Sequence, residues 1–405
     1  MKQKEIQIPK FAQGAATLYH IPASKSVLAR DIVLLHRFGK DADKIRRELL
    51  QRLGSEDLSG DIEVLLRALS TPVEHDCGES GTALRFLTAY LSSKKGKHLI
   101  KGSPRLKERP IEGLCKVLET SGVRFTFLEK MYAVPFITNN PIGDLHYPKE
   151  IDARDFPSSQ YLSALRLAGC PSAFILGDDF PSLPYFRLTE ARLECFGKDW
   201  DRIGDWSSAW YWIEHLLLQP TLKEVVVSNL SLSSGQPDEE LFHKVKGFFG
   251  IEAIQTPEGV TFRKTRSLPL TGTRLTIDIA PYPDQFLTFG CICLGLGLEF
   301  EALGTARLSL KESDRVLAFA ENIRHLFPGT DTLLEVENNR VYIKAGSQSR
   351  ENVILDGFND HRVVMSFAVL AASPHLDAAI SITDPEVVTK SYPAFWENLL
   401  PNPNS

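Results

Sequence analysis

Six times along the chain, a short polar segment opens directly onto an apolar run with helical spacing. The apolar runs include residues 83–91, 161–169 and 363–372. Apolar positions that recur with the period of a helix, directly after capping residues, predict that each polar segment marks a helix N-terminus. The six polar segments are Ser24-Lys25-Ser26, Glu79-Ser80-Gly81-Thr82, Ser158-Ser159-Gln160, Ser207-Ser208, Asp284-Gln285 and Asn359-Asp360-His361-Arg362.

Short β-type runs alternate with these helices. Strands are predicted at residues 5–11, 124–129, 173–177, 224–230, 259–264, 274–279, 340–345 and 379–383. Amphipathic spacing predicts further helices at residues 111–122, 239–250 and 315–327, and a charged surface helix within 40–57. The alternation indicates an α/β (α+β) protein whose helices pack inside sheets.

The spacing of the polar segments indicates a repeated unit. They begin 55, 79, 49, 77 and 75 residues apart, so three steps lie near 75. Phe86-Leu87-Thr88 returns as Phe286-Leu287-Thr288, and Leu106-Lys107-Glu108 returns as Leu310-Lys311-Glu312. These echoes lie 200 and 204 residues apart, which suggests duplication of half the chain. The step after Ser158 is only 49 residues, which indicates that one copy of the unit is shorter than the others.

Composition narrows the class of protein. A chain of 405 residues exceeds one usual core, so two domains are expected. The net charge is −5, without a basic run typical of nucleic-acid binding. The longest uncharged apolar stretch has 13 residues, too few to cross a membrane, and the N-terminus lacks a signal-peptide core. The six cysteines show no metal-ligand spacing, which favours buried, reduced thiols in a cytoplasmic protein.

Cations gather near the polar segments. They are Lys25, Arg30, Arg85, Arg105, Lys107, Arg109, Lys311, Arg315, Arg362 and Lys390. Helix N-termini favour anions, and arginine forks suit phosphate and carboxylate, so the sequence predicts a basic cleft for small, multiply charged anions. Ordinary N-caps and solvated charges are the alternative explanation.

Two segments offer acid–base groups. Asp284 follows a proline, and Glu312 lies between Lys311 and Arg315. Carboxylates tuned by adjacent cations can move protons on and off a substrate. Alternatively, Asp284 is an N-cap and Glu312 a first-turn helix charge. His361 is either a proton carrier or a residue that orients its neighbours.

The motifs SKS, ESGTALRFL, GSPRLKERPI, SSQYLSAL, LKESDR, NDHR and TKSYP occur in this order along the chain. Together they resemble the enolpyruvyl transferases, and within them the 5-enolpyruvylshikimate-3-phosphate synthase family. The resemblance implies a two-domain, inside-out α/β barrel of six βαβαββ units, one of them shortened here. One domain would span residues 21–204, and the other would join 1–20 to 205–405.

The resemblance also implies an activity. Family members transfer the enolpyruvyl group of phosphoenolpyruvate to the 5-hydroxyl of shikimate 3-phosphate and release phosphate, in the shikimate pathway to chorismate and aromatic amino acids. The reaction is an addition–elimination without metal or organic cofactor. We therefore expect these two small-molecule substrates, no nucleic-acid or membrane partner, a cytoplasmic location and a monomer.

Residue roles follow from the matched motifs. The resemblance assigns shikimate 3-phosphate to Lys25, Ser26, Arg30, Ser158, Ser159, Gln160, Ser182, Asp284 and Lys311. It assigns phosphoenolpyruvate to Lys25, Gly81, Arg109, Gln160, Arg315, Arg362 and Lys390. As the catalytic groups, Asp284 would take the proton of the 5-hydroxyl, Glu312 would exchange a proton with the methylene carbon, and Lys390 would assist the departing phosphate. Lys25 would lie close to both substrates, and His361 would support the site.

The chain departs from the family pattern at Ala29, Glu79 and Pro157. It is also shorter than the family between Tyr185 and Asp205, so the resemblance implies that a strand pair is missing there. Two alternatives stay open. UDP-N-acetylglucosamine enolpyruvyl transferases share the fold, but they place a cysteine in the loop that here runs from Ser103 to Arg109 without one. The non-enzymatic alternative is a degenerate relative that acts as an anion-binding or interaction protein, which the shortened segment and Glu79 favour.

Overall fold

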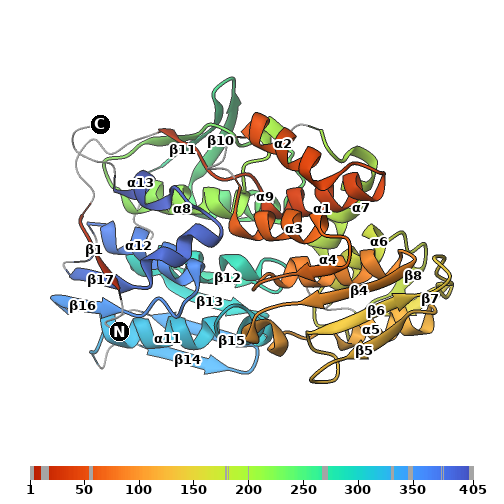
Figure 1. Ribbon diagram of the computed structural model, residues 1–405. Helices are drawn as coiled ribbons and strands as arrows, with labels where there is room; N and C mark the ends of the chain where they lie inside the picture. Colours follow the sequence, from red (N-terminus) through yellow and green to blue (C-terminus); the bar gives the residue numbers. More distant parts are fainter. Residues whose placement is uncertain are drawn as a thin grey trace. The chain divides into compact units, whose positions relative to one another are not determined.

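The computed structural model describes residues 4–10, 18–53, 58–177, 180, 182–198, 200–266, 272–329, 333–344, 350–374, 376 and 378–400. Contacts divide the chain into two compact halves (Figure 1). The central half spans Ala23–Asp201, and the terminal half joins Met1–Pro22 to Arg202–Ser405. Within each half, helices and sheets form the mixed α/β architecture that the sequence predicts. The domain limits near residues 20 and 204 stay predictions.

A complete βαβαββ repeat occupies residues 274–344 of the terminal half. Its four-stranded sheet has the order β12-β13-β15-β14, in which the first pair is parallel and the others are antiparallel. The elements are β12 (Arg274–Asp278), η3 (Pro283–Gln285), α10 (Phe286–Leu296), β13 (Glu299–Leu303), η4 (Thr305–Leu310), α11 (Arg315–Leu326), β14 (Leu333–Glu337) and β15 (Arg340–Lys344). The strands β12 and β15 were predicted, whereas β13 and β14 were not.

The same topology recurs in the central half at residues 74–140. Its sheet has the order β3-β4-β6-β5 with the same pattern of parallel and antiparallel pairs. The elements are β3 (Glu74–Asp76), α4 (Gly81–Ser92), β4 (Gly96–Lys101), η1 (Pro104–Glu108), α5 (Glu112–Thr120), β5 (Arg124–Phe127) and β6 (Phe136–Asn140). The echoes lie in corresponding elements at slightly different positions: one lies within α4 and at the start of α10, and the other ends η1 and begins at the last residue of η4. The duplication is confirmed at these two repeats.

Two further sheets in the terminal half each include one strand from the N-terminal segment of the chain. The sheet β10-β11-β9-β2 repeats the full topology, but residues 18–19 supply its first strand. In the sheet β1-β17-β16, residues 5–8 lie antiparallel to β17. The elements are β1 (Glu5–Ile8), β2 (Leu18–Tyr19), α8 (Trp206–Leu218), β9 (Glu224–Val227), α9 (Pro237–Phe249), β10 (Ile251–Thr256), β11 (Gly259–Lys264), β16 (Asn352–Leu355), α12 (His361–Ala372), β17 (Ala379–Thr383), η5 (Pro385–Lys390) and α13 (Phe395–Leu399).

The shortened repeat lies where the sequence places it. Its sheet holds only β7 (Glu150–Asp152) and β8 (Ala173–Ile175), joined by α6 (Gln160–Leu167). Helix α7 (Leu183–Cys195) and η2 (Trp200–Arg202) follow, and no strand occurs among the described residues between β8 and β9. The missing strand pair is therefore confirmed.

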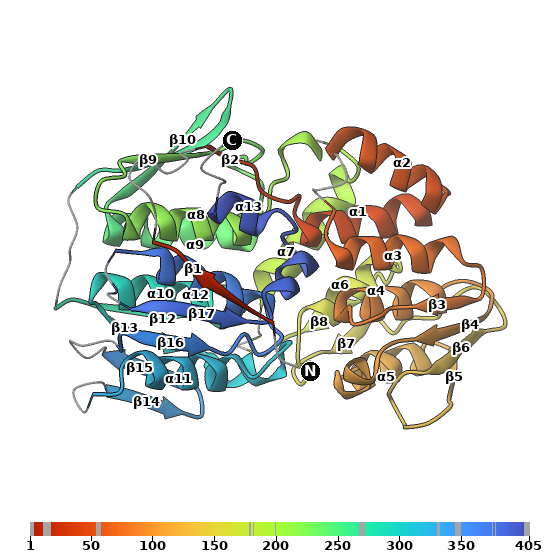
Figure 2. The same ribbon diagram turned by 60° about the vertical axis from the view of Figure 1, so that its left-hand side comes forward.

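A second departure was not predicted. Residues 25–70 form α1 (Lys25–Arg37), α2 (Ala42–Leu53) and α3 (Gly60–Ser70), which pack on one another (Figure 2). The described part of this segment, which omits 54–57, contains no β-type pairing, and an isolated bridge at Ala23 comes just before it. A helical hairpin thus stands where the repeat pattern expects a sheet. The surface helix predicted within residues 40–57 is α2.

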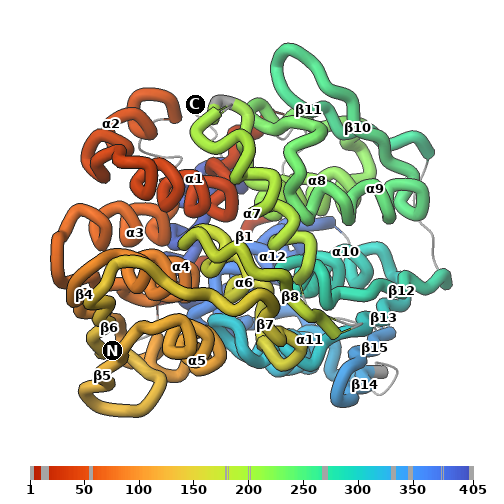
Figure 3. The backbone as a smooth tube through the Cα atoms, turned by 90° about the vertical axis from the view of Figure 1, so that its right-hand side faces the viewer, coloured from red at the N-terminus to blue at the C-terminus, as the bar shows by residue number. Residues whose placement is uncertain are grey.

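All six polar segments lie at the N-termini of inner helices, namely α1, α4 and α6 in the central half and α8, α10 and α12 in the terminal half. Every residue of α8, α10 and α12 is buried, and these three helices pack side by side, as Figure 3 shows for α8 and α10. A helix that is buried all round belongs inside its sheets. On β12, buried and exposed residues alternate, so the sheet has one inner face. Among the described residues, no helix is long and apolar enough to cross a membrane.

Candidate active site

Arg315 organises the cluster in the terminal half. It opens α11, its side chain is 1 % exposed, and its guanidinium contacts three carboxylates. Nη1 donates to Asp284 at 2.8 Å, Nη2 to Glu312 at 2.9 Å and Nε to Asp360 at 3.1 Å. Burial alone would lower the pKa of Arg315, but the charges of the three carboxylates outweigh it and raise that pKa. The guanidinium is therefore a permanent cation that fixes all three acids.

Arg362 approaches the same carboxylate from another helix. It lies in the first turn of α12, and its Nη2 donates to Asp284 Oδ2 at 3.1 Å and to Ser207 Oγ at 3.0 Å. Lys311 Nζ adds a third cation, 3.4 Å from Asp284 Oδ1. Three positive charges favour the ionised carboxylate, which is the form a general base needs. Asp284 remains 21 % exposed, so it is accessible to a substrate.

Asp360 secures the start of α12. It is fully buried, caps the helix by accepting from Arg362 N at 2.9 Å, and also accepts from Ser313 Oγ at 3.0 Å. Burial opposes its charge, but Arg315 prevails and lowers the pKa of Asp360. His361 lies beside it, with Nδ1 3.8 Å from Asp360 Oδ1 and 1 % exposure. Such burial fits a supporting residue better than a group that meets substrate directly.

Backbone strain marks the loop before α12. Phe358 and Asn359 both adopt positive φ, 51° and 49°, which non-glycine residues rarely do. Asn359 N donates to Asp384 Oδ2 at 3.2 Å, and Asp384 itself has φ 55° where η5 begins. Consecutive strained residues persist only where the surroundings hold them, and they concentrate at functional sites. Lys390 ends η5, which packs on α12, and its side chain is half-buried.

Asp238, on α9, is a buried carboxylate next to this cluster. It is 3 % exposed, and its Oδ1 accepts from Gln285 Nε2 at 2.8 Å. Burial, together with the charges of Asp284 and Asp205, raises the pKa of Asp238 to about 7. Gln285 is the neighbour of Asp284 in η3, so Asp238 fixes the short helix that carries the candidate base.

In the central half, two arginines lie over the first turn of α4. A Cβ at Gly81 would lie 3.0 Å from Arg85 Nη1 and 3.1 Å from Arg109 Nη2. Arg85 Nη1 donates to Gln160 Oε1 at 2.5 Å, and Gln160 Nε2 donates to Thr82 Oγ1 at 3.2 Å. Two guanidinium groups and a helix N-terminus thus converge where glycine leaves room, which suits an anion.

The start of α1 carries the other candidate ligands. Lys25 opens the helix and pairs with Asp61 on α3 at 3.4 Å, with 22 % of its side chain exposed. Ser26 follows it and is half-buried. Arg30, which the resemblance assigns to shikimate 3-phosphate, is buried, with only 3 % of the residue exposed. Burial lowers the pKa of Arg30 to about 10, which leaves it charged at neutral pH.

Arg30 is held by α7. Its Nε donates to Thr189 Oγ1 at 2.6 Å, and its Nη2 donates to the carbonyl of Tyr185 at 2.8 Å. Its Nη1 donates back to the carbonyl of Ser26 at 2.6 Å. Arg30 therefore joins α1 to α7 in this structure, and a role in binding substrate stays a prediction.

The serines lie at two helix starts. Ser158 accepts from Gln160 N at 3.3 Å, and Ser159 is the buried N-cap of α6. Ser182 caps α7 with φ 53°. Of the departures, Glu79 is exposed beside the Ser80 cap of α4, while Ala29 is buried in α1.

The structure thus groups Asp284, Lys311, Glu312, Arg315, His361 and Arg362 in one half, and Gly81, Arg109 and Gln160 in the other. Arg85 was counted among the cations but not chosen as a site residue, although it donates to Gln160 and lies beside Gly81. The sequence analysis also did not identify Asp61, Asp238 and Asp360 as residues of the candidate site. Asp360 was visible as a cap, but Asp61 and Asp238 carried no signal because their partners lie far along the chain.

Comparison with known proteins agrees with the motifs. The family model "EPSP synthase (3-phosphoshikimate 1-carboxyvinyltransferase)" matches residues 40–202 and 190–399. A 3-phosphoshikimate 1-carboxyvinyltransferase from Shewanella loihica is 31% identical over 97% of this chain and 98% of its own length. One from Bacteroides fragilis is 30% identical over 96% and 95%.

Solved structures show the same fold. The EPSP synthase of Acinetobacter baumannii superimposes with a TM-score of 0.66 at 18% identity and covers 97% of both chains. The enolpyruvyl transferase NikO from Streptomyces tendae gives 0.62 at 12% identity, covering 98% of this chain and 96% of its own. At such identities the likeness concerns architecture, and it confirms the predicted fold class.

Proposed function

Because the chain belongs to the EPSP synthase (3-phosphoshikimate 1-carboxyvinyltransferase) family, we propose that it transfers the enolpyruvyl group of phosphoenolpyruvate to the 5-hydroxyl of shikimate 3-phosphate. In the addition step the hydroxyl oxygen bonds to C2 of phosphoenolpyruvate and C3 gains a proton. In the elimination step C3 loses a proton and the C2–O bond to phosphate breaks. The products are the enolpyruvyl ether and inorganic phosphate.

The observation that carries the proposal is the Asp284 cluster. A carboxylate held by Arg315, Arg362 and Lys311, yet partly exposed, is placed to accept the proton of a substrate hydroxyl. Glu312 is 20 % exposed beside it and serves as the acid and base for C3. Both roles need a carboxylate whose position is fixed before the substrate arrives.

The remaining assignments follow the charges of the substrates. Arg109, beside Gly81 and Arg85, binds phosphoenolpyruvate, and Gln160 helps to place both substrates. Lys25 and the serines Ser158, Ser159 and Ser182 hold shikimate 3-phosphate. Arg362 holds the phosphoenolpyruvate carboxylate, and Lys390 stabilises the departing phosphate.

Arg30 and Arg315 have structural partners in addition to their proposed ligands. We assign Arg315 a supporting part, because three carboxylates already surround its fork. The protein is proposed to act as a monomer in the cytoplasm. Sedimentation of the purified chain tests the monomer, and a dimer at micromolar concentration would reject it.

The first test is phosphate release by the purified protein with both substrates, and with each omitted in turn. Phosphate release that requires both substrates would support the transferase activity. A folded protein that binds shikimate 3-phosphate without turnover would instead support the degenerate anion-binding relative.

A matched pair of variants tests the assignment in the central half. Arg109→Gln should raise the KM for phosphoenolpyruvate about tenfold or more, because it removes a charge-assisted contact with an anion. Arg105→Gln is the control, since Arg105 lies in the same loop, is half-exposed and pairs with Glu108. Equal kinetics for the two variants would refute the role of Arg109.

A further inference from the structure

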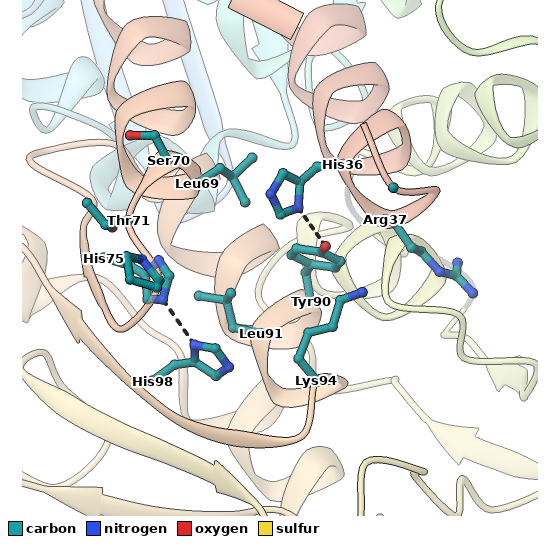
Figure 4. Close-up of a pocket in the computed structure, with 12 residues that line it drawn as sticks. His36, Arg37, Leu69, Ser70, Thr71, His75, Tyr90, Leu91, Lys94 and His98 are labelled. Carbon is teal, nitrogen blue, oxygen red and sulfur yellow. Dashed lines mark hydrogen bonds between the residues drawn. The ribbon is translucent and has the colours of Figure 1, made fainter. Parts of the chain in front are cut away.

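A pocket far from the proposed site opens at the other ends of two inner helices. It lies wholly in the central half, encloses about 410 Å³, and is lined from α1, α3, α4 and the loop and strand that follow (Figure 4). Lys25 and Gly81 begin α1 and α4, whereas the pocket meets these helices at His36 and Leu91. With a rise of about 1.5 Å per residue, the two places are roughly 16 Å apart along each helix.

Imidazoles and an ammonium group line this pocket. His36, Tyr90 and Lys94 lie on one side in Figure 4, and His75 and His98 lie on the other. His36 Nδ1 lies 2.7 Å from Tyr90 Oη, and His75 Nε2 lies 3.1 Å from His98 Nδ1. Each imidazole is thus held in place before any ligand binds.

The charge of the lining is positive. Lys94 and Arg37 are cations, and none of the twelve lining residues is an aspartate or glutamate. Asp41, at the start of α2, is the acidic group that acts on His36 from outside the lining. The Arg37 guanidinium points away toward the carbonyl of Leu167, to which it donates at 3.2 Å, so it contributes charge rather than contact.

Lys94 is the group available for a ligand. Its Nζ lies 5.0 Å from the centre of the Tyr90 ring, and among the described residues it makes no hydrogen bond or ion pair. Lysines often sit at helix C-termini simply to satisfy carbonyls. Here the final carbonyls of α4 already accept from Ser93 N and Lys94 N, so the ammonium group is not needed as a cap.

The environment disfavours positive charge on these groups as they stand. Burial, followed by Arg37, lowers the pKa of Lys94, and burial, followed by Lys94, lowers that of His36. Burial also lowers the pKa of His75 and of His98. A bound anion would relieve this repulsion, and it would draw protons onto the imidazoles.

We propose that this pocket is a second anion site, which binds the phosphate group of a small metabolite or free phosphate through Lys94, His36 and His98. Two nearby cations offset the negative charge of the phosphate, and the imidazole and phenol groups supply further donors. A metal is the poorer occupant, because the described residues place no group of three His, Cys, Asp or Glu side chains for one. The proposal is independent of the enzymatic activity.

The test follows the histidine resonances of the full-length protein by NMR while inorganic phosphate is added. Substitution of His36 and His98 by glutamine, one at a time, assigns their signals. We expect saturable shifts of both signals at millimolar phosphate, and tighter binding at about pH 6 than at about pH 8, because protonated imidazoles hold the anion. Shifts absent at saturating phosphate, or produced instead by zinc alone, would overturn the proposal.

Lys94→Met and Lys97→Met provide the matched pair. Lys97 is exposed on β4, next to His98 but outside the lining. Lys94→Met should weaken phosphate binding at these histidines about tenfold or more, the loss expected for one charge-assisted contact, while Lys97→Met leaves it unchanged. Equal affinities would show that the anion binds elsewhere, and so would reject the site. Because the readout is the imidazoles themselves, phosphate bound at the proposed active site does not mimic this result.

Discussion

Replacing Asp31 with asparagine is expected to loosen α7 from α1 in the central half. The Asp31 side chain is fully buried on α1 and accepts from Arg192 Nε at 2.7 Å, Gly197 N at 2.9 Å and Trp200 Nε1 at 2.9 Å. Arg192 Nη2 also donates to it. One carboxylate thus anchors α7 and the chain that follows, where the strand pair of the repeat is missing.

The size of the effect follows from burial. Arg192 is only 9 % exposed, so removing its partner's charge leaves a guanidinium with little access to water. Breaking such a pair costs about 3–5 kcal/mol, and an asparagine oxygen that keeps some of the hydrogen bonds puts the expected loss near the lower end, about 3 kcal/mol. Asp152→Asn is the control, because Asp152 also pairs with an arginine in this half but is 52 % exposed. Its substitution should change nothing measurable.

Hydrogen exchange read by mass spectrometry suits this test, because a chain of two halves does not unfold in one transition. A loss of about 3 kcal/mol should speed exchange of the α7 amides roughly a hundredfold, while the amides of α8 stay protected. Leucine at both Asp31 and Arg192 should recover part of the protection, since no charge is then stranded. Unchanged exchange in Asp31→Asn, relative to the Asp152→Asn control, would refute the anchor.

Three shorter predictions concern the proposed site. Asp284→Asn should lower kcat about 10²–10⁴-fold in phosphate release, as expected for loss of a general base, whereas Glu301→Gln, which removes an arginine-paired carboxylate on β13, should not. Asp238 has a raised pKa of about 7, so its stabilising protonated form is lost as pH rises from about 4 to 7. Asp238→Asn should therefore raise Tm more at about pH 8 than at about pH 5, and a pH-independent change in Tm would contradict this. Gly81→Ala should raise the KM for phosphoenolpyruvate about tenfold and leave the KM for shikimate 3-phosphate nearly unchanged, because the added Cβ would lie 3.0 and 3.1 Å from two guanidinium groups. Equal changes in both KM values would contradict this prediction.

The repeats were predictable because they leave local marks. A capping residue before an apolar run is a signal within a few residues, and it located all six inner helices. Strands β3 and β7 were missed because their three residues, Glu-His-Asp and Glu-Ile-Asp, are mostly charged, whereas the equally short but apolar β8 was predicted. The sequence also could not show which sheets the N-terminal strands join, because the pairing of β2 with β9 depends on contacts over about half the chain.

The chemistry was predictable to a smaller extent. Motifs singled out Asp284, Glu312 and Arg362, but nothing local says that Arg362 donates to Ser207 or that Asp238 holds Gln285. Such partners come from helices that only folding brings together. The sequence does not show how exposed each arginine side chain is, and the structure shows large differences. Arg315 is 1 % exposed, while Arg105 is half-exposed. The predicted cations therefore divide into those that can meet substrate and those that support the acids.

Arg30 shows how the shortened repeat alters the site. Without a strand pair after β8, α7 packs directly on α1, and its Thr189 and Tyr185 take the donors of Arg30. The same guanidinium donates to the carbonyl of Ser26, so α7 is linked through Arg30 to the first turn of α1, where Lys25 lies. Loosening α7 should then displace the proposed ligands of shikimate 3-phosphate without removing any of them. Asp31→Asn should therefore raise the KM for shikimate 3-phosphate more than the KM for phosphoenolpyruvate. An equal rise in both KM values would show that the Asp31 contacts do not act on the shikimate 3-phosphate ligands through α7.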